Sequence, residues 1–164
     1  MTRGARAGYT AMMTRSHSLL TVLAAALVAC GDSTGPADDL ARNRTLWQAE
    51  GSADYEFGFQ RLCYCPEEAV RPVQIRVTAG AVVSVIDALG QPVDSLAVAR
   101  YFTITIDSLF GVVAHAIAVD AHRLTVRYDP EFGYPESIAI DYDAATVDEE
   151  MLLSARLLIP FSIP

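Results

Sequence analysis

The stretch that decides the fold is residues 72–87, PVQIRVTAGAVVSVID. Apolar and polar residues alternate over its first half, which is the pattern of a strand with one buried face. The turn formers Ala79 and Gly80 follow, and an apolar run returns from Val82 to Ile86. We therefore predict a β-hairpin here, and a hairpin implies antiparallel pairing of its two strands.

The spacing of apolar residues differs between the segments before and after this hairpin. Aromatic residues alternate with polar or small ones over residues 55–61, which predicts a half-buried strand. From Thr105 the period becomes that of a helix, because apolar residues recur three or four positions apart as far as Ile117. Thr105 is the predicted cap of this helix.

The C-terminal part predicts three more strands. A second hairpin is expected over residues 124–142, with the turn-rich connection 129–135 (DPEFGYP) between its strands. A last strand, residues 151–159, is ended by Pro160. A short helix, capped by Asp38 or Asp39, precedes the first strand. The predicted fold class is α+β: an antiparallel β-sheet of about five to six strands with one or two helices packed on one face.

The N-terminal segment has the pattern of a secretory signal. Arginines precede the uncharged apolar run 19–29 (LLTVLAAALVA), which is too short to span a bilayer because spanning takes roughly 20 residues. The run ends at Ala29-Cys30. Small residues before a cysteine at this point resemble the lipobox of bacterial lipoproteins, which implies cleavage before Cys30 and acylation of its thiol and amino group. The alternatives are a plain secretory signal and an uncleaved anchor.

This interpretation divides the chain into three parts. They are a lipoprotein signal peptide over residues 1–29, a flexible tether over 30–38 and a single α+β domain over 39–164. The protein is then expected in the cell envelope, lipid-anchored through Cys30 on the periplasmic or cell-surface side of a bacterial membrane.

The exported part is strongly acidic. After the predicted cleavage site the chain carries nine arginines, no lysine and twenty acidic residues, a net charge of −11. An acidic surface argues against a nucleic-acid partner and against electrostatic attachment to anionic lipid. We therefore expect acyl chains to hold the protein at the membrane.

Cys63 and Cys65 form an even pair once Cys30 is lipidated, and they are the sharpest local feature. Residues two apart in a regular strand lie about 6.5–7 Å apart between α-carbons, at or beyond the usual disulfide limit of about 6.8 Å. A bond therefore needs a bend, which Pro66 favours. The open interpretations are a structural disulfide, a thiolate pair for a soft metal, a redox-active pair and two inert thiols.

The acidic and histidine residues single out no catalytic pair and no metal site, and an enzyme that acts through paired carboxylates is the third and weakest interpretation. Carboxylates surround the second hairpin connection without the spacing of a calcium loop, so a solvated turn is favoured; they are Asp129, Glu131, Glu136, Asp141 and Asp143. His115 and His122 lack metal-ligand spacing. The sequence has neither a nucleophile motif nor a phosphate-binding glycine loop, and we expect no cofactor.

Several ordered motifs together resemble a family of secreted bacterial proteins and lipoproteins, the domain of unknown function DUF 6174. The resemblance covers most of residues 42–160 and rests on the motifs NRTLW (43–47), DYEF (54–57), RLCYCP (61–66), DSLF (107–110), YDPEFGYP (128–135), IDYD (140–143) and DEE (148–150). It implies an exported location and names no activity.

Two functions are expected from these observations. The first is a membrane-anchored, non-enzymatic envelope module that binds a protein or peptide, along a sheet edge for example, or has a structural role. The second is a thiol- or metal-handling protein that uses Cys63 and Cys65.

Overall fold

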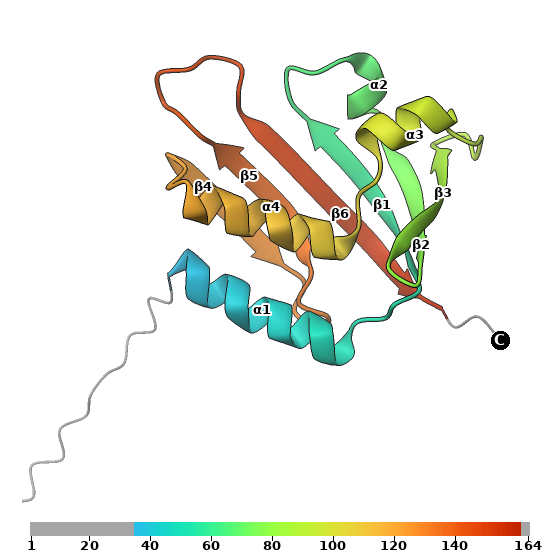
Figure 1. Ribbon diagram of the computed structural model, residues 1–164, viewed down its shortest axis with the longest axis horizontal. Coiled ribbons are helices and arrows are strands. Elements are labelled where there is room, and N and C mark those ends of the chain that lie inside the picture. Colours follow the sequence, from blue (N-terminus) through green and yellow to red (C-terminus); the bar gives the residue numbers. More distant parts are fainter. Residues whose placement is uncertain (1–34, 162–164) are drawn as a thin grey trace, which may run out of the picture. The chain divides into compact units, whose positions relative to one another are not determined.

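The computed structural model describes residues 35–161 (Figure 1). Ten elements follow one another along this part of the chain. They are α1 (Pro36–Glu50), β1 (Tyr55–Leu62), α2 (Glu67–Val70), β2 (Val73–Thr78), β3 (Ala81–Asp87), α3 (Ser95–Tyr101), α4 (Ile106–Ala118), β4 (Arg123–Tyr128), β5 (Pro135–Asp141) and β6 (Met151–Pro160).

The strands of the described region form one antiparallel sheet, in the order β3-β2-β1-β6-β5-β4. Both predicted hairpins are present as the neighbouring pairs β2–β3 and β4–β5. The last strand, β6, lies between β1 and β5 and so joins the two halves of the sheet. The predicted α+β class with an antiparallel sheet is confirmed.

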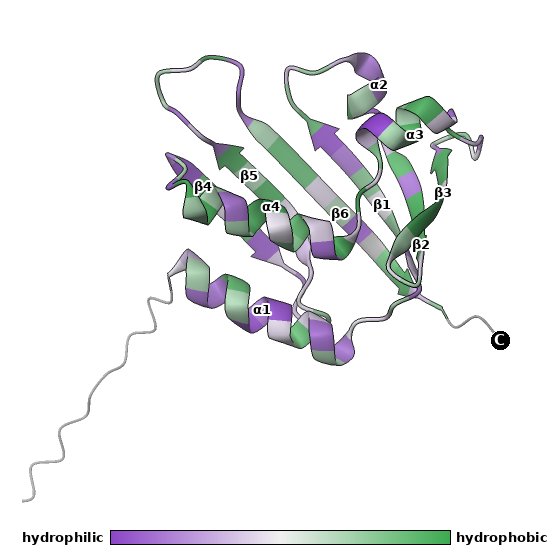
Figure 2. Cartoon of the chain, in the orientation of Figure 1, coloured by the Kyte–Doolittle hydropathy of each residue, from purple (hydrophilic) through white to green (hydrophobic). Residues whose placement is uncertain are grey.

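One face of the sheet is covered by helices. α4 packs against β4 and β5, α2 against β1, and α1 against α4. The side chains between these layers are buried and apolar, and the largest of them include Tyr55, Phe57, Phe59, Ile75, Phe110 and Ile138. Burial of one such side chain contributes about 1.5–3 kcal/mol, so this layer supplies most of the favourable free energy of folding. Figure 2 shows α4 as more hydrophobic than α1.

Helix α4 begins as its sequence predicts. The Thr105 hydroxyl accepts a hydrogen bond from the Ser108 N–H at 3.1 Å, and the Ser108 hydroxyl accepts one from the Thr105 N–H at 2.9 Å. This reciprocal capping satisfies main-chain donors that a helix start leaves unpaired. The buried residues Ile106, Leu109, Phe110, Val113 and Ala116 then line one side of the helix.

The first helix begins earlier than predicted. α1 starts at Pro36 with Gly35 as its N-cap, so the end of the predicted 30–38 tether is helical and Asp38 and Asp39 lie in the first turn. Proline fits the first helical position, where no N–H is needed, and carboxylates in that turn are favoured by the helix dipole. The predicted signal peptide and Cys30 lie outside the described residues.

Helices α2 and α3 have no counterpart in the sequence prediction. None of the α3 residues is fully buried, although Val98 and Tyr101, three positions apart, pack against the core. The cap of α3 is visible only in the structure, where the Asp94 side chain accepts hydrogen bonds from the N–H groups of Leu96 and Ala97.

One described stretch, Ser95–Ala118, is long and apolar enough to cross a membrane by length and composition alone. The chain breaks it into α3 and α4, and the apolar side of α4 is buried in the domain core. The structure therefore uses its C-terminal half as a core helix.

Candidate functional site

The other face of the sheet is not covered by any helix of the described region. Alternate residues of β1 point to the two faces, so Tyr55, Phe57 and Phe59 meet the helices while Gly58 and Gln60 lie on the open face. The open face carries polar and small residues in its centre.

A groove of about 660 Å³ crosses β2, β1 and β6 on this face. Its polar lining residues are Gln60, Gln74, Asp87, Ser137, Ser154 and Arg156, and its apolar ones include Leu62, Pro72, Ile86, Ala88 and Leu152. Amides and hydroxyls both donate and accept hydrogen bonds. The groove is thus suited to a ligand that offers donors, acceptors and apolar groups together, as a polypeptide does.

Gly58 shapes the floor of the groove. A methyl group placed there would lie 3.5 Å from the Arg156 carbonyl oxygen and 3.5 Å from the Gln74 Oε1, which is ordinary van der Waals distance. The fold therefore tolerates a side chain at this position, and the groove is open there because the residue has none.

The groove lining holds two charged side chains, Asp87 and Arg156. The Asp87 carboxylate accepts hydrogen bonds from the main-chain N–H groups of Leu89 and Gln91, each at 2.9 Å. On the same face Arg76 forms an ion pair with Glu56, and Arg127 forms one with Glu136 at 3.5 Å. Arg156 is in no ion pair among residues 35–161. In a domain with a large excess of acidic residues, this exposed cation favours a ligand that carries a carboxylate.

A second hollow of about 340 Å³ adjoins the groove over β5 and β6. Leu62 and Leu152 line both hollows, and they are opposite each other in the β1–β6 register. Their side chains are 49% and 36% exposed. The two hollows and this apolar pair give one continuous surface that is long enough for an extended ligand.

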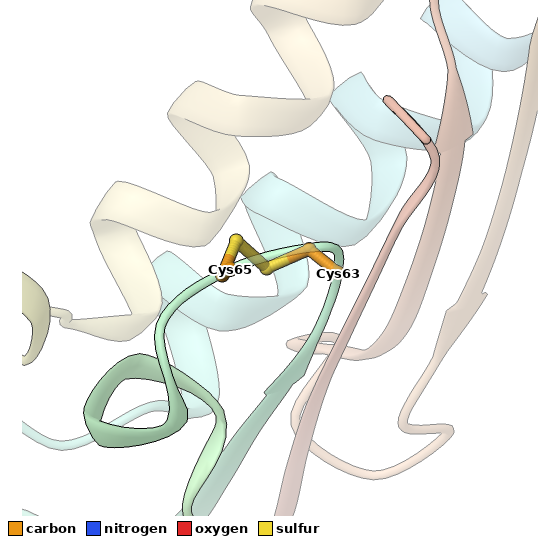
Figure 3. Close-up of a disulfide and its surroundings, with 2 residues drawn as sticks. All are labelled: Cys63 and Cys65. Carbon is orange, nitrogen blue, oxygen red and sulfur yellow. A yellow bond between two sulfur atoms is a disulfide. The ribbon is translucent and has the colours of Figure 1, made fainter. Parts of the chain in front are cut away.

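The Cys63–Cys65 pair follows directly after Leu62, in the loop between β1 and α2 (Figure 3). The two sulfurs form a disulfide, with the α-carbons 5.2 Å apart. The Cys65 N–H donates to the Cys63 carbonyl oxygen at 2.9 Å, so the chain turns at Tyr64. This turn supplies the bend that a regular strand lacks. In this state neither sulfur is a thiolate able to bind a soft metal.

The disulfide closes a very small ring. Chain-entropy arguments assign a three-residue ring about 1.6 kcal/mol of stabilisation, against about 3 kcal/mol for a ring of fifteen residues. β1 is held by β2 on one side and β6 on the other, independently of this bond. The cross-link therefore adds little to the stability of the sheet.

Two acidic residues of the second hairpin region, Asp129 and Asp143, accept hydrogen bonds from nearby residues. The Asp129 carboxylate accepts hydrogen bonds from the N–H groups of Glu131 and Phe132, and this builds the turn. Hydrogen bonds from the Ala145 N–H and the Thr146 hydroxyl lower the pKa of Asp143. Asp141 lies in β5, opposite Arg123. Within residues 35–161, no three His, Cys, Asp or Glu residues are placed to hold a metal ion.

Both histidines of the described region lie next to Tyr142, although neither is buried. The His115 ring lies 6.2 Å from the Tyr142 ring, measured between centroids. The main-chain N–H of His122 donates a hydrogen bond to the main-chain carbonyl oxygen of Tyr142 at 3.3 Å. Sequence spacing does not reveal this neighbourhood, because α4 and β5 come together only in the fold.

Comparison with known proteins gives a family and no activity. The family described as "Family of unknown function (DUF6174)" matches residues 39–160. No curated protein and no solved structure matches the chain.

Proposed function

The chain belongs to the DUF6174 family of unknown function, and we propose that it is a lipid-anchored, non-enzymatic binding module of the bacterial cell envelope. Its partner is an extended segment of an exported protein, with apolar side chains and a carboxylate. The single observation that carries this proposal is the uncovered sheet face with its groove and adjoining hollow.

The shape and chemistry of that face support a polypeptide partner. An extended ligand can lie across both hollows and place apolar side chains against Leu62 and Leu152. Its main-chain groups match the amides and hydroxyls of the lining, and its carboxylate reaches Arg156. A hydrogen bond between charged groups contributes about 1.5–3 kcal/mol, which is roughly tenfold to a hundredfold in affinity.

The binding experiment uses the full chain and fluorescent peptides in which apolar residues flank one aspartate. We expect the aspartate peptide to bind more tightly than the matched asparagine peptide, by about tenfold or more. Arg156→Gln should abolish this difference, and Gly58→Ala should weaken both peptides by partly filling the groove. Arg44→Gln is the matched control, because Arg44 is exposed on α1, outside the groove.

Absence of binding to either peptide, or an equal loss in Arg44→Gln and Arg156→Gln, would contradict the assigned groove. The melting temperature of each variant, measured in parallel, separates lost binding from lost folding.

The anchor is tested separately. The apolar run before Cys30 supports lipidation of that thiol. We expect Cys30→Ala to move the protein out of the membrane fraction of the native host and to remove the lipid mass seen by mass spectrometry. Continued membrane attachment of Cys30→Ala would contradict the proposed lipidation of Cys30. It would not bear on the proposal that the groove binds a polypeptide.

A further inference from the structure

The disulfide beside the open face is accessible in the folded protein. Cys65 is exposed, Cys63 is half-buried, and the Tyr64 side chain between them is 85% exposed. Exposed disulfides are in general the labile ones, because a thiolate can reach the sulfur without unfolding the protein.

Opening this bond leaves the strands in place. The cross-link bridges one residue only and lies in the loop after the last residue of β1. The β1 ladder ends at Leu62, so its hydrogen bonds to β2 and β6 do not depend on the cysteines. We therefore expect the domain to stay folded when the Cys63–Cys65 bond is reduced.

We propose that Cys63 and Cys65 form a thiol–disulfide exchange site for cysteine residues of exported polypeptides. A polypeptide thiolate attacks the sulfur of Cys65, the more exposed residue, and forms a mixed disulfide. The Cys63–Cys65 bond breaks, and its electron pair leaves on the Cys63 sulfur, which takes up a proton from water.

The exchange then runs in one of two directions. Return attack by the Cys63 thiolate restores the original disulfide and releases the polypeptide thiol. Attack by a second thiolate of the same polypeptide releases Cys65 instead. The polypeptide then loses two electrons to become a disulfide, and the pair becomes two thiols. Another protein disulfide of the envelope, as the two-electron oxidant, regenerates the Cys63–Cys65 bond.

The surroundings of the loop favour a polypeptide over a small polar thiol. Tyr64, Leu62 and Leu152 place exposed apolar surface around the site. Such a surface binds the apolar residues of a polypeptide chain and offers nothing comparable to glutathione. The exchange requires a polypeptide cysteine and no carboxylate at Arg156, so it is tested independently of the proposed groove ligand.

The first test compares folded and urea-unfolded full-length protein under attack by reduced glutathione. Alkylation of Cys63 and Cys65 is read by mass spectrometry in the tryptic peptide 62–76, which excludes Cys30. We expect similar reaction rates in the two states. A bond that reacts only after unfolding would overturn the proposal.

The second test identifies the thiol source. A peptide with one cysteine between leucine and phenylalanine residues should react faster than glutathione at equal thiolate concentration, and Tyr64→Ser should reduce that advantage. Equal rates for the peptide and glutathione would overturn the assignment to polypeptides.

The third test assigns the attacked sulfur. The cysteine peptide of the second test is mixed with the oxidised full-length protein, and the reaction is stopped early with an alkylating agent. In the tryptic peptide 62–76, mass spectrometry should find the peptide disulfide-bonded to Cys65 and the alkyl group on Cys63. Adducts mainly on Cys63, or shared equally between the two sulfurs, would contradict attack at Cys65.

Discussion

The hydroxyl oxygen of Tyr55 accepts a hydrogen bond from the main-chain N–H of Ile106 at 2.9 Å. This bond joins the start of β1 to the first turn of α4, across the buried layer. Ile106 is the first residue of its helix, so its N–H has no partner within the helix. The tyrosine thus satisfies a buried donor that the helix itself leaves unpaired.

Removal of this hydroxyl should destabilise the domain. We expect Tyr55→Phe to lower the free energy of unfolding by about 1–3 kcal/mol, because the Ile106 N–H becomes buried and unpaired. Tyr128→Phe is the matched control, since the buried Tyr128 hydroxyl has no hydrogen-bond partner in the described part of the chain. Urea denaturation measures both variants. An equal decrease in the free energy of unfolding for the two variants would show that the Tyr55 hydrogen bond does not stabilise the domain.

Stability should fall in strongly alkaline solution. Burial raises the pKa of Tyr55 to about 12, and burial does the same for Tyr128 and Tyr134. An unfolded tyrosine ionises near pH 10. Because the folded state keeps these tyrosines protonated and neutral, their contribution to the free energy of unfolding is complete below about pH 10. That contribution is lost as the pH rises from about 10 to 12. Denaturation series across this interval measure the loss.

The ultraviolet absorbance of tyrosinate checks the same prediction directly. Part of the tyrosine signal should appear near pH 12 in the folded protein and near pH 10 in urea. A single transition near pH 10 in both states would contradict the raised pKa values.

Gly133 marks a close approach between α1 and the connection from β4 to β5. A methyl group there would lie 2.5 Å from the Asn43 carbonyl oxygen and 2.9 Å from the Leu46 Cβ, at a positive φ of 76°. We expect Gly133→Ala to cost about 2–5 kcal/mol, which combines backbone strain with overpacking. Melting temperature and urea denaturation both report this cost.

Gly80→Ala separates the two contributions. Gly80 has almost the same φ, 75°, and nothing lies within 4 Å of an added methyl group. It should therefore cost only the backbone strain, about 1–2 kcal/mol. If the two variants are equally stable, α1 does not pack as closely on Gly133 as described.

Loss of the disulfide should have a small effect on folding. The double variant Cys63→Ala with Cys65→Ala is expected to lower the free energy of unfolding by about 1.6 kcal/mol at most, because the ring that the bond closes is so short. Calorimetry of the oxidised, reduced and double-variant proteins checks this. A loss of several kcal/mol would mean that the bond holds more of the structure than the loop itself.

Local periodicity predicted most of the elements. Alternation from Val73 to Val77 defines β2, and apolar spacing after the Thr105 cap defines α4, because each pattern records which side of the element faces the core. Helix α3 was not predicted, because it has only 7 residues and packs on the core through the partly buried side chains of Val98 and Tyr101. Helix α1 begins at Pro36 and not after an aspartate cap, because proline and first-turn carboxylates serve that start.

The groove, unlike the elements, was not predictable from local pattern. Leu62 and Leu152 are opposite each other only because β6 pairs with β1. Arg156 comes to lie beside Gly58 by the same pairing. The alternation of apolar and polar residues shows which residues of one strand lie on the same face. It does not show which face of the sheet the helices cover.

The sequence by itself determined the class of fold, the strands and main helices, and the position of the cysteine pair next to a strand end. These properties depend on neighbours a few positions away, which the sequence pattern records directly. The tertiary structure alone decided the strand order and the uncovered face with its groove. Those features arise from pairing and packing between segments that are far apart in the chain, and no local pattern encodes them.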